Sequence, residues 1–170
     1  MHYQGARQDF LLLPDLLGNR YTKSMNNSIT VKTTINAPIE KVWEYWTAPE
    51  HIVHWAFASD DWETPAAEND VREGGKFKTV MAAKDAHSTS SGQESTSFDF
   101  SGVYTVVKEH ELIEYDMDDG RHVKIAFTAT PEGVTITETF DPEHENSLEV
   151  QQGGWQAILE NFKKYVEGNT

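Results

Sequence analysis

The end of the chain carries its longest helical pattern of apolar residues. Between positions 146 and 168, large side chains recur at alternating spacings of four and three, which predicts an amphipathic helix with one broad apolar stripe. The stripe comprises Leu148, Gln152, Trp155, Leu159, Phe162 and Val166, flanked by Gln151, Ile158 and Tyr165. Asn146 and Glu149 have the spacing of a capping box, and Gly168 is a typical helix end.

Two adjacent glycines, Gly153 and Gly154, interrupt this predicted helix. Each costs a helix about 1 kcal/mol relative to Ala, so their presence calls for a reason. We expect another element to pack closely against the helix at this point. The alternative is that the pair lets the helix bend, so that its first turns act as a gate.

The first part of the chain predicts a strand and two short helices. Ser28–Ile35 alternates polar residues with a buried set, namely Ile29, Val31, Thr33 and Ile35. Pro38 suits the first position of a helix in which apolar residues recur at helical spacing, namely Ile39, Val42, Trp43 and Trp46. Thr47–Glu50 has the form of another capping box and predicts a second short helix, with Ile52 and Trp55 turned inward.

The middle of the chain alternates apolar and polar residues in segments separated by turns. The turn signals are Gly74-Gly75, Asp119-Gly120 and Pro131–Gly133. Residues 60–70 are polar and broken and give no clear pattern, but they can accommodate a strand around Trp62 or just before Arg72. About six antiparallel strands are expected here.

This order of elements predicts an α+β fold. A twisted sheet of six to seven strands curls, and its apolar concave face must be covered. The C-terminal helix is the long element available to cover it. We therefore expect a curved antiparallel sheet around that helix, with the two short helices placed after the first strand.

Composition narrows the classes of function. The 170 residues suffice for one domain with a real core. The net charge of −14 repels phosphate backbones, so we expect no nucleic-acid partner. The absence of cysteine excludes disulfides and thiolate metal sites and fits a cytoplasmic protein. No apolar run approaches the ~20 residues of a membrane span, so no membrane insertion is expected.

The N-terminus is expected to be an extension rather than a signal peptide. Phe10–Leu17 is apolar, but Pro14 and Asp15 interrupt it and no clear cleavage site follows. Residues 1–24 are therefore interpreted as a flexible or docking extension, and residues 25–170 as a single domain. Ala86–Ser97 is small and polar throughout, which predicts a long hairpin loop.

A set of motifs resembles a known superfamily. They are Ala37-Pro38, Val42-Trp43, Asp70–Gly75, Phe98–Gly102, Asp119–Arg121, Glu138–Phe140 and Gly154-Trp155. In this order they resemble the START-like (SRPBCC) superfamily over about residues 28–167. Within it, the chain is similar to stand-alone bacterial members related to the C-terminal domain of the Hsp-ninety ATPase activator, often labelled polyketide-cyclase-like.

The resemblance implies a helix-grip fold with a deep hydrophobic cavity between the sheet and the last helix. It also implies binding of lipids, sterols, polyketides or other hydrophobic molecules, and some relatives are cyclases or aromatases. None of the motifs is a catalytic signature. The separate N-terminal domain of the chaperone activator has no counterpart in 24 residues, so a chaperone partner is not expected.

Large apolar residues on both walls of the expected cavity are the candidate ligand contacts. The sheet contributes Phe77, Met81, Phe100, Tyr104, Tyr115 and Phe127, and the helices contribute Trp46, Trp55, Trp155, Leu159 and Phe162. Trp62 is a further candidate. Few polar groups accompany them, which is typical of a pocket for a small hydrophobic molecule.

Glu138 is the most informative polar residue, because strict alternation places it on the interior face with Ile136 and Phe140. A buried carboxyl group needs donors or stays protonated, and it suits a ligand anchor or a general acid or base. Its structural alternative is a fixed hydrogen bond to Trp, Tyr or Arg72. Arg72 is the candidate polar anchor for a ligand carboxylate, or else a partner of Asp70 or Glu138.

Metal and cofactor sites are not expected. His51 and His54 have ligand spacing, but no third ligand is evident and both are interpreted as surface residues. Asp116, Asp118 and Asp119 do not match a calcium loop. No phosphate loop, nucleophile elbow or dinucleotide fingerprint occurs.

The pattern as a whole favours non-covalent binding of a small hydrophobic molecule over an enzyme. The alternatives are a cyclase or hydrolase that uses Glu138 as acid or base, and a protein-interaction module related to the chaperone activator. A homodimer remains open.

Overall fold

Seven strands form one antiparallel sheet in the computed structural model, which describes residues 27–84 and 96–169. They are β1 (Ile29–Ile35), β2 (Trp62–Asn69), β3 (Lys76–Ala83), β4 (Ser97–Lys108), β5 (Leu112–Met117), β6 (His122–Thr130) and β7 (Gly133–Phe140). Their order across the sheet is β1-β7-β6-β5-β4-β3-β2, so the first strand and the second form opposite edges. The sheet confirms the predicted architecture, including the uncertain strand at Trp62.

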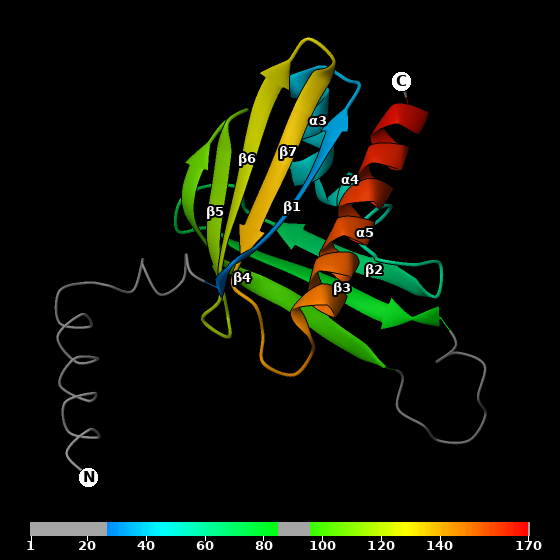
Figure 1. Ribbon diagram of the computed structural model, residues 1–170, viewed down its shortest axis with the longest axis vertical. Helices are drawn as coiled ribbons and strands as arrows, with labels where there is room; N and C mark the ends of the chain where they lie inside the picture. Colours follow the sequence, from blue (N-terminus) through cyan, green and yellow to red (C-terminus); the bar gives the residue numbers. More distant parts are fainter. Residues whose placement is uncertain (1–26, 85–95, 170) are drawn as a thin grey trace, which may run out of the picture.

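Three helices complete the described fold: α3 (Ile39–Thr47), α4 (Pro49–Ile52) and α5 (Leu148–Gly168). Figure 1 shows α5 lying in the opening between the part of the sheet around β1 and β7 and the part around β2 and β3. β-Bulges between Glu63 and Ala66 and between Tyr104 and Val106 bend the strands locally. The predicted helix-grip arrangement is therefore present.

Alternation decides which face of each strand is buried. On β1 the residues Ile29, Val31, Thr33 and Ile35 are buried, as predicted. On the outer face, threonines of β1 meet threonines of β7, and the Thr34 and Thr135 hydroxyls lie 2.8 Å apart. Such cross-strand pairs stabilise the outer face while the apolar set faces the core.

The tight turn before β7 requires glycine. Gly133 has φ 136°, and a Cβ atom there would lie 2.0 Å from the carbonyl oxygen of Ile35. The turn can therefore lie against the end of β1 only without a side chain at this position. Asp119-Gly120 forms the predicted turn between β5 and β6, with Gly120 at φ 91°.

The start of α5 differs from the prediction. Ser147, not Asn146, is the N-cap, and its hydroxyl accepts the N–H of Val150 at 3.2 Å, so the proposed capping box with Glu149 is wrong. Leu148 is 56% exposed, and Gln151 is buried in place of Gln152. The apolar stripe therefore begins at Trp155, about two turns later than its spacing indicated.

Two glutamines of α5 cover the open edge of the sheet. The side-chain amides of Gln152 and Gln156 donate to the carbonyl oxygens of Thr30 and Lys32, at 3.3 and 3.0 Å. Edge strands carry unpaired carbonyl groups that must find donors. These two bonds attach the helix to β1.

The starts of the short helices also differ in detail. Pro38 is the N-cap of α3 rather than its first residue, and Ala48 is the N-cap of α4 without a side-chain bond. The Thr47 hydroxyl donates instead to the Trp43 carbonyl oxygen within α3 at 2.8 Å, so the second predicted capping box is wrong. Thr47 belongs to the last turn of the preceding helix and is not free to cap the next.

Two sequence predictions concern membrane spans and the segments at residues 1–24 and 86–97. None of the helices in residues 27–84 and 96–169 is both long and apolar enough to cross a membrane. The predicted extension, residues 1–24, and most of the predicted 86–97 loop lie outside the described residues.

Candidate ligand-binding cavity

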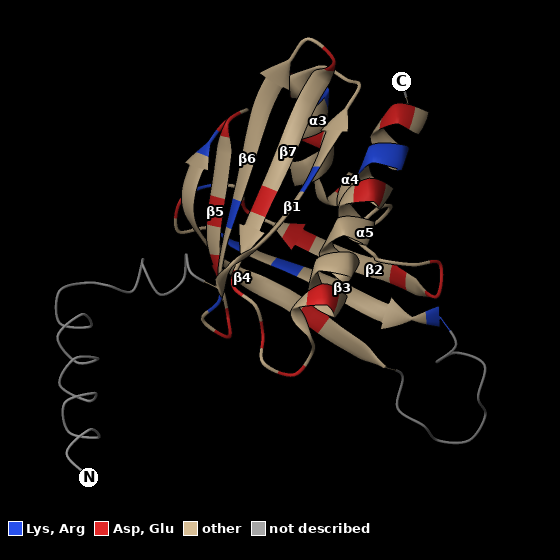
Figure 2. Ribbon diagram, in the orientation of Figure 1, with Lys and Arg blue, Asp and Glu red and all other residues tan. Residues whose placement is uncertain are grey.

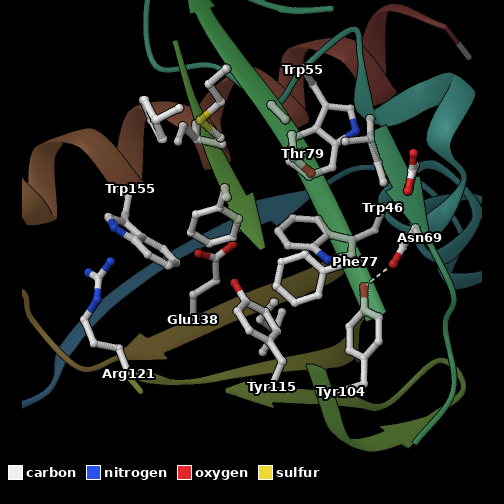
Figure 3. Close-up of a pocket in the computed structure, with 18 residues that line it drawn as sticks. Trp46, Trp55, Asn69, Phe77, Thr79, Tyr104, Tyr115, Arg121, Glu138 and Trp155 are labelled. Carbon is white, nitrogen blue, oxygen red and sulfur yellow. Dashed lines mark hydrogen bonds between the residues drawn. The ribbon is translucent and has the colours of Figure 1, made fainter. Parts of the chain in front are cut away.

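A cavity of about 270 Å³ lies between the concave face of the sheet, the two short helices and α5 (Figure 3). Most of the predicted contact residues line it: Trp46, Trp55, Phe77, Met81, Phe100, Tyr104, Tyr115, Glu138 and Trp155. They come from elements far apart in sequence. The cavity is therefore a product of the closed fold rather than of one motif.

Phe77 lies at the centre of the sheet wall. Its ring centroid is 4.6 Å from that of Tyr115, 5.2 Å from that of Tyr104 and 5.8 Å from that of Phe100. These rings come from β3, β4 and β5, which are neighbours in the sheet. Period-2 alternation on three adjacent strands thus produces a continuous aromatic surface.

Trp155 forms the helix wall at one end of the cavity. Its indole stacks on Phe140 of β7, with centroids 3.8 Å apart and planes at 12°, and meets Phe100 edge-on at 5.9 Å. One side of the ring is thus held by the core. Ile158, one turn further along α5, also lines the space.

Trp46 and Trp55 form the wall contributed by the short helices. Their ring centroids are 4.8 Å apart. The indole N–H of Trp55 donates to the Tyr45 carbonyl oxygen at 3.0 Å. Because this polar atom is bonded within the protein, Trp55 offers the cavity an apolar surface.

Asn69 links three walls through hydrogen bonds. Its side-chain oxygen accepts the Tyr104 hydroxyl, and its amide nitrogen donates to the Thr47 carbonyl oxygen at 2.7 Å. Burial is the main cause that raises the pKa of Tyr104, so the phenol remains protonated. This network joins β2, β4 and α3 and positions the Tyr104 ring.

Glu138 and Tyr115 are two buried residues with polar groups that line another part of the cavity. Their exposed fractions are 5% and 6%. Burial alone raises the pKa of Glu138 to about 8, and burial together with the nearby Glu138 raises the pKa of Tyr115. Both side chains are therefore uncharged at neutral pH.

Neither of these two groups has a hydrogen-bond partner among residues 27–84 and 96–169. Neither group is sealed off from the cavity space. Figure 3 shows the Tyr115 hydroxyl and the Glu138 carboxyl group directed toward the same region of the cavity. Since buried polar groups are normally bonded, this pair is available to a ligand.

Arg121 takes the place predicted for Arg72. Arg121 lines the cavity near Trp155 (Figure 3), and its Nε donates to Asp119 at 2.9 Å. Arg72 instead pairs with Asp70 at 2.9 Å, with both side chains largely exposed, and reaches neither Glu138 nor the cavity. The prediction of Arg72 as a cavity anchor is wrong, because the turn after β2 directs it outward.

Four other predicted contact residues lie outside the cavity lining. Phe127 packs edge-on against Trp43 and Trp46, and Phe162 against Trp46 and Trp55. These residues and Leu159 are buried in the filled part of the core. Trp62 packs against Phe98 at 5.7 Å.

Several lining residues were missed by the sequence interpretation. They include Ile52, Ala56, Glu68, Asn69, Thr79, Phe98, Arg121, Ile125 and Ile158. Alternation with Phe77, Phe100 and Phe127 could have identified Thr79, Phe98 and Ile125. No local pattern marks Arg121 or Asn69, because a turn and a weakly patterned strand carry them.

In residues 27–84 and 96–169, no group of three or more His, Asp or Glu side chains converges in a way that could hold a metal ion. His51 is half-buried rather than a surface residue, since its Nδ1 lies 2.8 Å from the Tyr165 hydroxyl. Its ring stacks on Tyr45 at 3.9 Å. This histidine therefore has a packing role.

Comparison with known protein families and with solved structures identifies the same family for this chain. The family described as "Activator of Hsp90 ATPase homolog 1-like protein" matches residues 36–167. A solution structure of an AHSA1-like protein from Aeromonas hydrophila is 40% identical, with a TM-score of 0.75, covering 84% of this chain and 93% of the other.

A second solution structure, Chr148 from Cytophaga hutchinsonii, is 54% identical with a TM-score of 0.69, covering 84% and 94% of the two chains. Protein NE0264 from Nitrosomonas europaea shares the fold at 18% identity, with a TM-score of 0.69 and coverage of 84% and 96%. A comparison with curated proteins gives no match.

Proposed function

The chain belongs to the family of Activator of Hsp90 ATPase homolog 1-like proteins, and from this premise we propose that it binds a small hydrophobic molecule in the cavity between the sheet and α5. The observation that carries the proposal is the aromatic cavity of about 270 Å³. Protein interiors are normally filled to crystal-like density, so an open space of this size needs a reason.

The size and lining of the cavity define the ligand. Its volume lies just below the roughly 300–1,000 Å³ typical of ligand pockets, which favours a compact molecule over a long lipid. Aromatic rings from β3, β4, β5 and α5 form much of the lining. Such walls bind flat, apolar surfaces.

A titration with an uncharged fluorescent probe, N-phenyl-1-naphthylamine, tests this proposal. We expect saturable binding to the wild-type protein and weaker binding to Ala56→Leu, because Ala56 is buried and lines the cavity. Ala58→Leu is the matched control, since Ala58 is exposed two residues further along. Circular dichroism verifies that both variants fold.

Two results would contradict the proposal. One is the absence of saturable binding to the wild-type protein. The other is an equal loss of affinity in both variants, which would place the probe outside the cavity.

An enzymatic role for Glu138 is a second candidate, because its raised pKa of about 8 suits proton transfer near neutral pH. In that case Glu138→Gln abolishes turnover of the ligand while its binding persists. If wild-type protein leaves a bound ligand chemically unchanged, binding alone is the function.

A chaperone-related interaction module is a weaker candidate. The family description supports this candidate. The cavity formed by residues in the ranges 27–84 and 96–169 does not, because it leaves the interior partly unfilled. A module that works through its surface has no need of such a cavity. Retention of partner binding by Ala56→Leu would favour the module, whereas its loss would favour the cavity.

A further inference from the structure

Glu138 of β7 and Tyr115 of β5 both lie on the concave face of the sheet, and β6 lies between these two strands. Glu138 of β7 pairs with Ile125 of β6, and Tyr115 of β5 pairs with Val123 of the same β6 strand. The long Tyr115 side chain extends across the neighbouring strand toward Glu138 (Figure 3). Burial raises the pKa of Tyr115, and the carboxylate form of the nearby Glu138 raises it further.

Three other polar side chains of the cavity lining are already bonded to protein atoms. Tyr104 bonds Asn69, Trp55 bonds a carbonyl oxygen, and Arg121 is paired with Asp119. Glu138 and Tyr115 are more than nine-tenths buried and have no bond within the described residues. An unused pair of this kind is costly to the fold unless a ligand completes it.

The hydrogen-bonding capacity of Glu138 and Tyr115 indicates which kind of ligand atom they would bind. A protonated carboxyl group and a phenol each donate one hydrogen bond, so together they suit one acceptor oxygen. A carbonyl oxygen has two lone pairs and can accept both bonds at once. Two donors of this type in an apolar site therefore favour a carbonyl oxygen.

The electrostatic surroundings disfavour an anionic ligand. The chain has a net charge of −14, and Figure 2 shows acidic residues at many turns and at both ends of α5. Arg121 is the cationic residue in the cavity lining, and Asp119 already engages it. A ligand carboxylate would therefore lose its hydration for little compensation.

We propose that Glu138 and Tyr115 together bind the carbonyl oxygen of an uncharged ring compound whose rings lie against the aromatic walls. This inference rests on the proposed function and specifies its ligand class. The rings contact the surface around Phe77 and Phe100, and the oxygen satisfies the two buried donors.

The proposal implies a pH dependence, because the donor at Glu138 exists only in its protonated form. The pKa of Glu138 is about 8, so ligand affinity falls as the pH rises through that value. The other titratable groups that line the cavity are Glu68 of β2, Tyr104 of β4, Tyr115 of β5 and Arg121. Among described residues, α3, α4 and α5 place no titratable side chain in the lining.

Three bicyclic probes of one shape test the inference: 2-acetylnaphthalene, its hydrocarbon isostere 2-isopropenylnaphthalene, and 2-naphthoate. Calorimetry or ligand-observed NMR at about pH 7 gives the affinities. We expect the ketone to bind about tenfold more tightly than the hydrocarbon, as two modest hydrogen bonds would provide. The naphthoate should bind more weakly than the ketone.

Variants assign the preference to the two residues. Tyr115→Phe should lower affinity for the ketone about threefold to tenfold and leave the hydrocarbon unchanged. Glu138→Gln keeps an N–H donor, so it should retain the ketone preference and lose the decline in affinity between about pH 7 and about pH 9. Glu73→Gln, at an exposed position outside the cavity lining, is the control that should keep this decline.

The outcomes separate this inference from the proposed function. If hydrocarbon and ketone bind equally well, the cavity binds apolar molecules but the donor pair is not used, and the inference fails alone. Tighter binding of naphthoate than of the ketone also overturns it and assigns an anion site to Arg121. If none of the three probes binds, the inference fails together with the proposed function.

Discussion

The two halves of α5 perform different tasks although they form one continuous helix. The C-terminal half buries Leu159, Phe162 and Val166 completely, against the short helices and the sheet. The N-terminal half exposes Val150 by 63%, and beyond it Trp155 and Ile158 border the cavity. One half thus closes a filled core, and the other covers a space.

This difference separates stability from binding along one element. The filled half contributes dense packing, which any loss of volume disturbs. The covering half is held by Trp155 on Phe140 and by two glutamine bonds to β1. Variants in the two halves should therefore differ in both size and kind of effect.

The largest expected effect is on the filled half. Phe162→Ala should lower the free energy of unfolding by about 3–5 kcal/mol, because the ring is fully buried and contacts Trp46 and Trp55. Ile158→Ala should cost only about 1 kcal/mol, since its side chain already borders open space. Urea unfolding measures both values, and equal losses would contradict the comparison.

The next effect concerns the pH dependence of stability. Folding raises the pKa of Glu138 from 4.5 to about 8, so the folded state binds the proton more tightly. The resulting stabilisation is fully present below the unfolded pKa and is lost as the pH rises through the folded one. The free energy of unfolding should fall by up to about 1.4 kcal/mol per pH unit from this group.

Glu138→Gln should remove this component of the slope between about pH 5 and about pH 8. Glu68→Gln should leave it in place, because Glu68 is exposed at the rim. Denaturant midpoints across this range provide the measurement. An unchanged slope in Glu138→Gln would mean that the carboxyl group does not bear the proton.

A smaller effect is expected at the two glycines of the covering half. A Cβ atom at Gly153 or Gly154 would meet nothing within 4 Å, so the predicted close packing is wrong. Replacing both with Ala should raise the free energy of unfolding by about 1–2 kcal/mol. Thermal melting measures the gain, and a lower melting temperature would show a contact that the structure lacks.

The same double variant tests the remaining explanation, a helix bend. If the glycines let the first turns of α5 open over the cavity, stiffening should slow dissociation of a bound probe. Stopped-flow displacement of N-phenyl-1-naphthylamine would detect this. An unchanged dissociation rate would eliminate the bend.

The smallest effect is expected at the start of α5. Ser147→Ala removes the hydroxyl that accepts the Val150 N–H and should cost about 0.5–1 kcal/mol at this exposed position. Asn146→Ala serves as the control, because its side chain is not the cap. Thermal melting would reject the assignment if Asn146→Ala cost more than Ser147→Ala.

The order and type of the elements could be predicted because periodicity is a local property. The spacing of Leu159, Phe162 and Val166 predicted the buried face of the last helix, and alternation predicted the buried faces of β1 and β7. Glu138 was placed inside for the same reason. Glu138 is buried because it occupies an inward-facing position of β7, although its side chain is polar.

Only the tertiary structure decided which apolar residues fill the core and which border the cavity. Phe127 and Phe162 belong to the same patterns as Phe100 and Trp155, yet the short helices cover the first two and leave the others at an open space. It also chose Arg121 over Arg72, because turns set the direction of side chains that no periodicity governs. A cavity is empty volume between distant segments, and its boundaries exist only once those segments have come together.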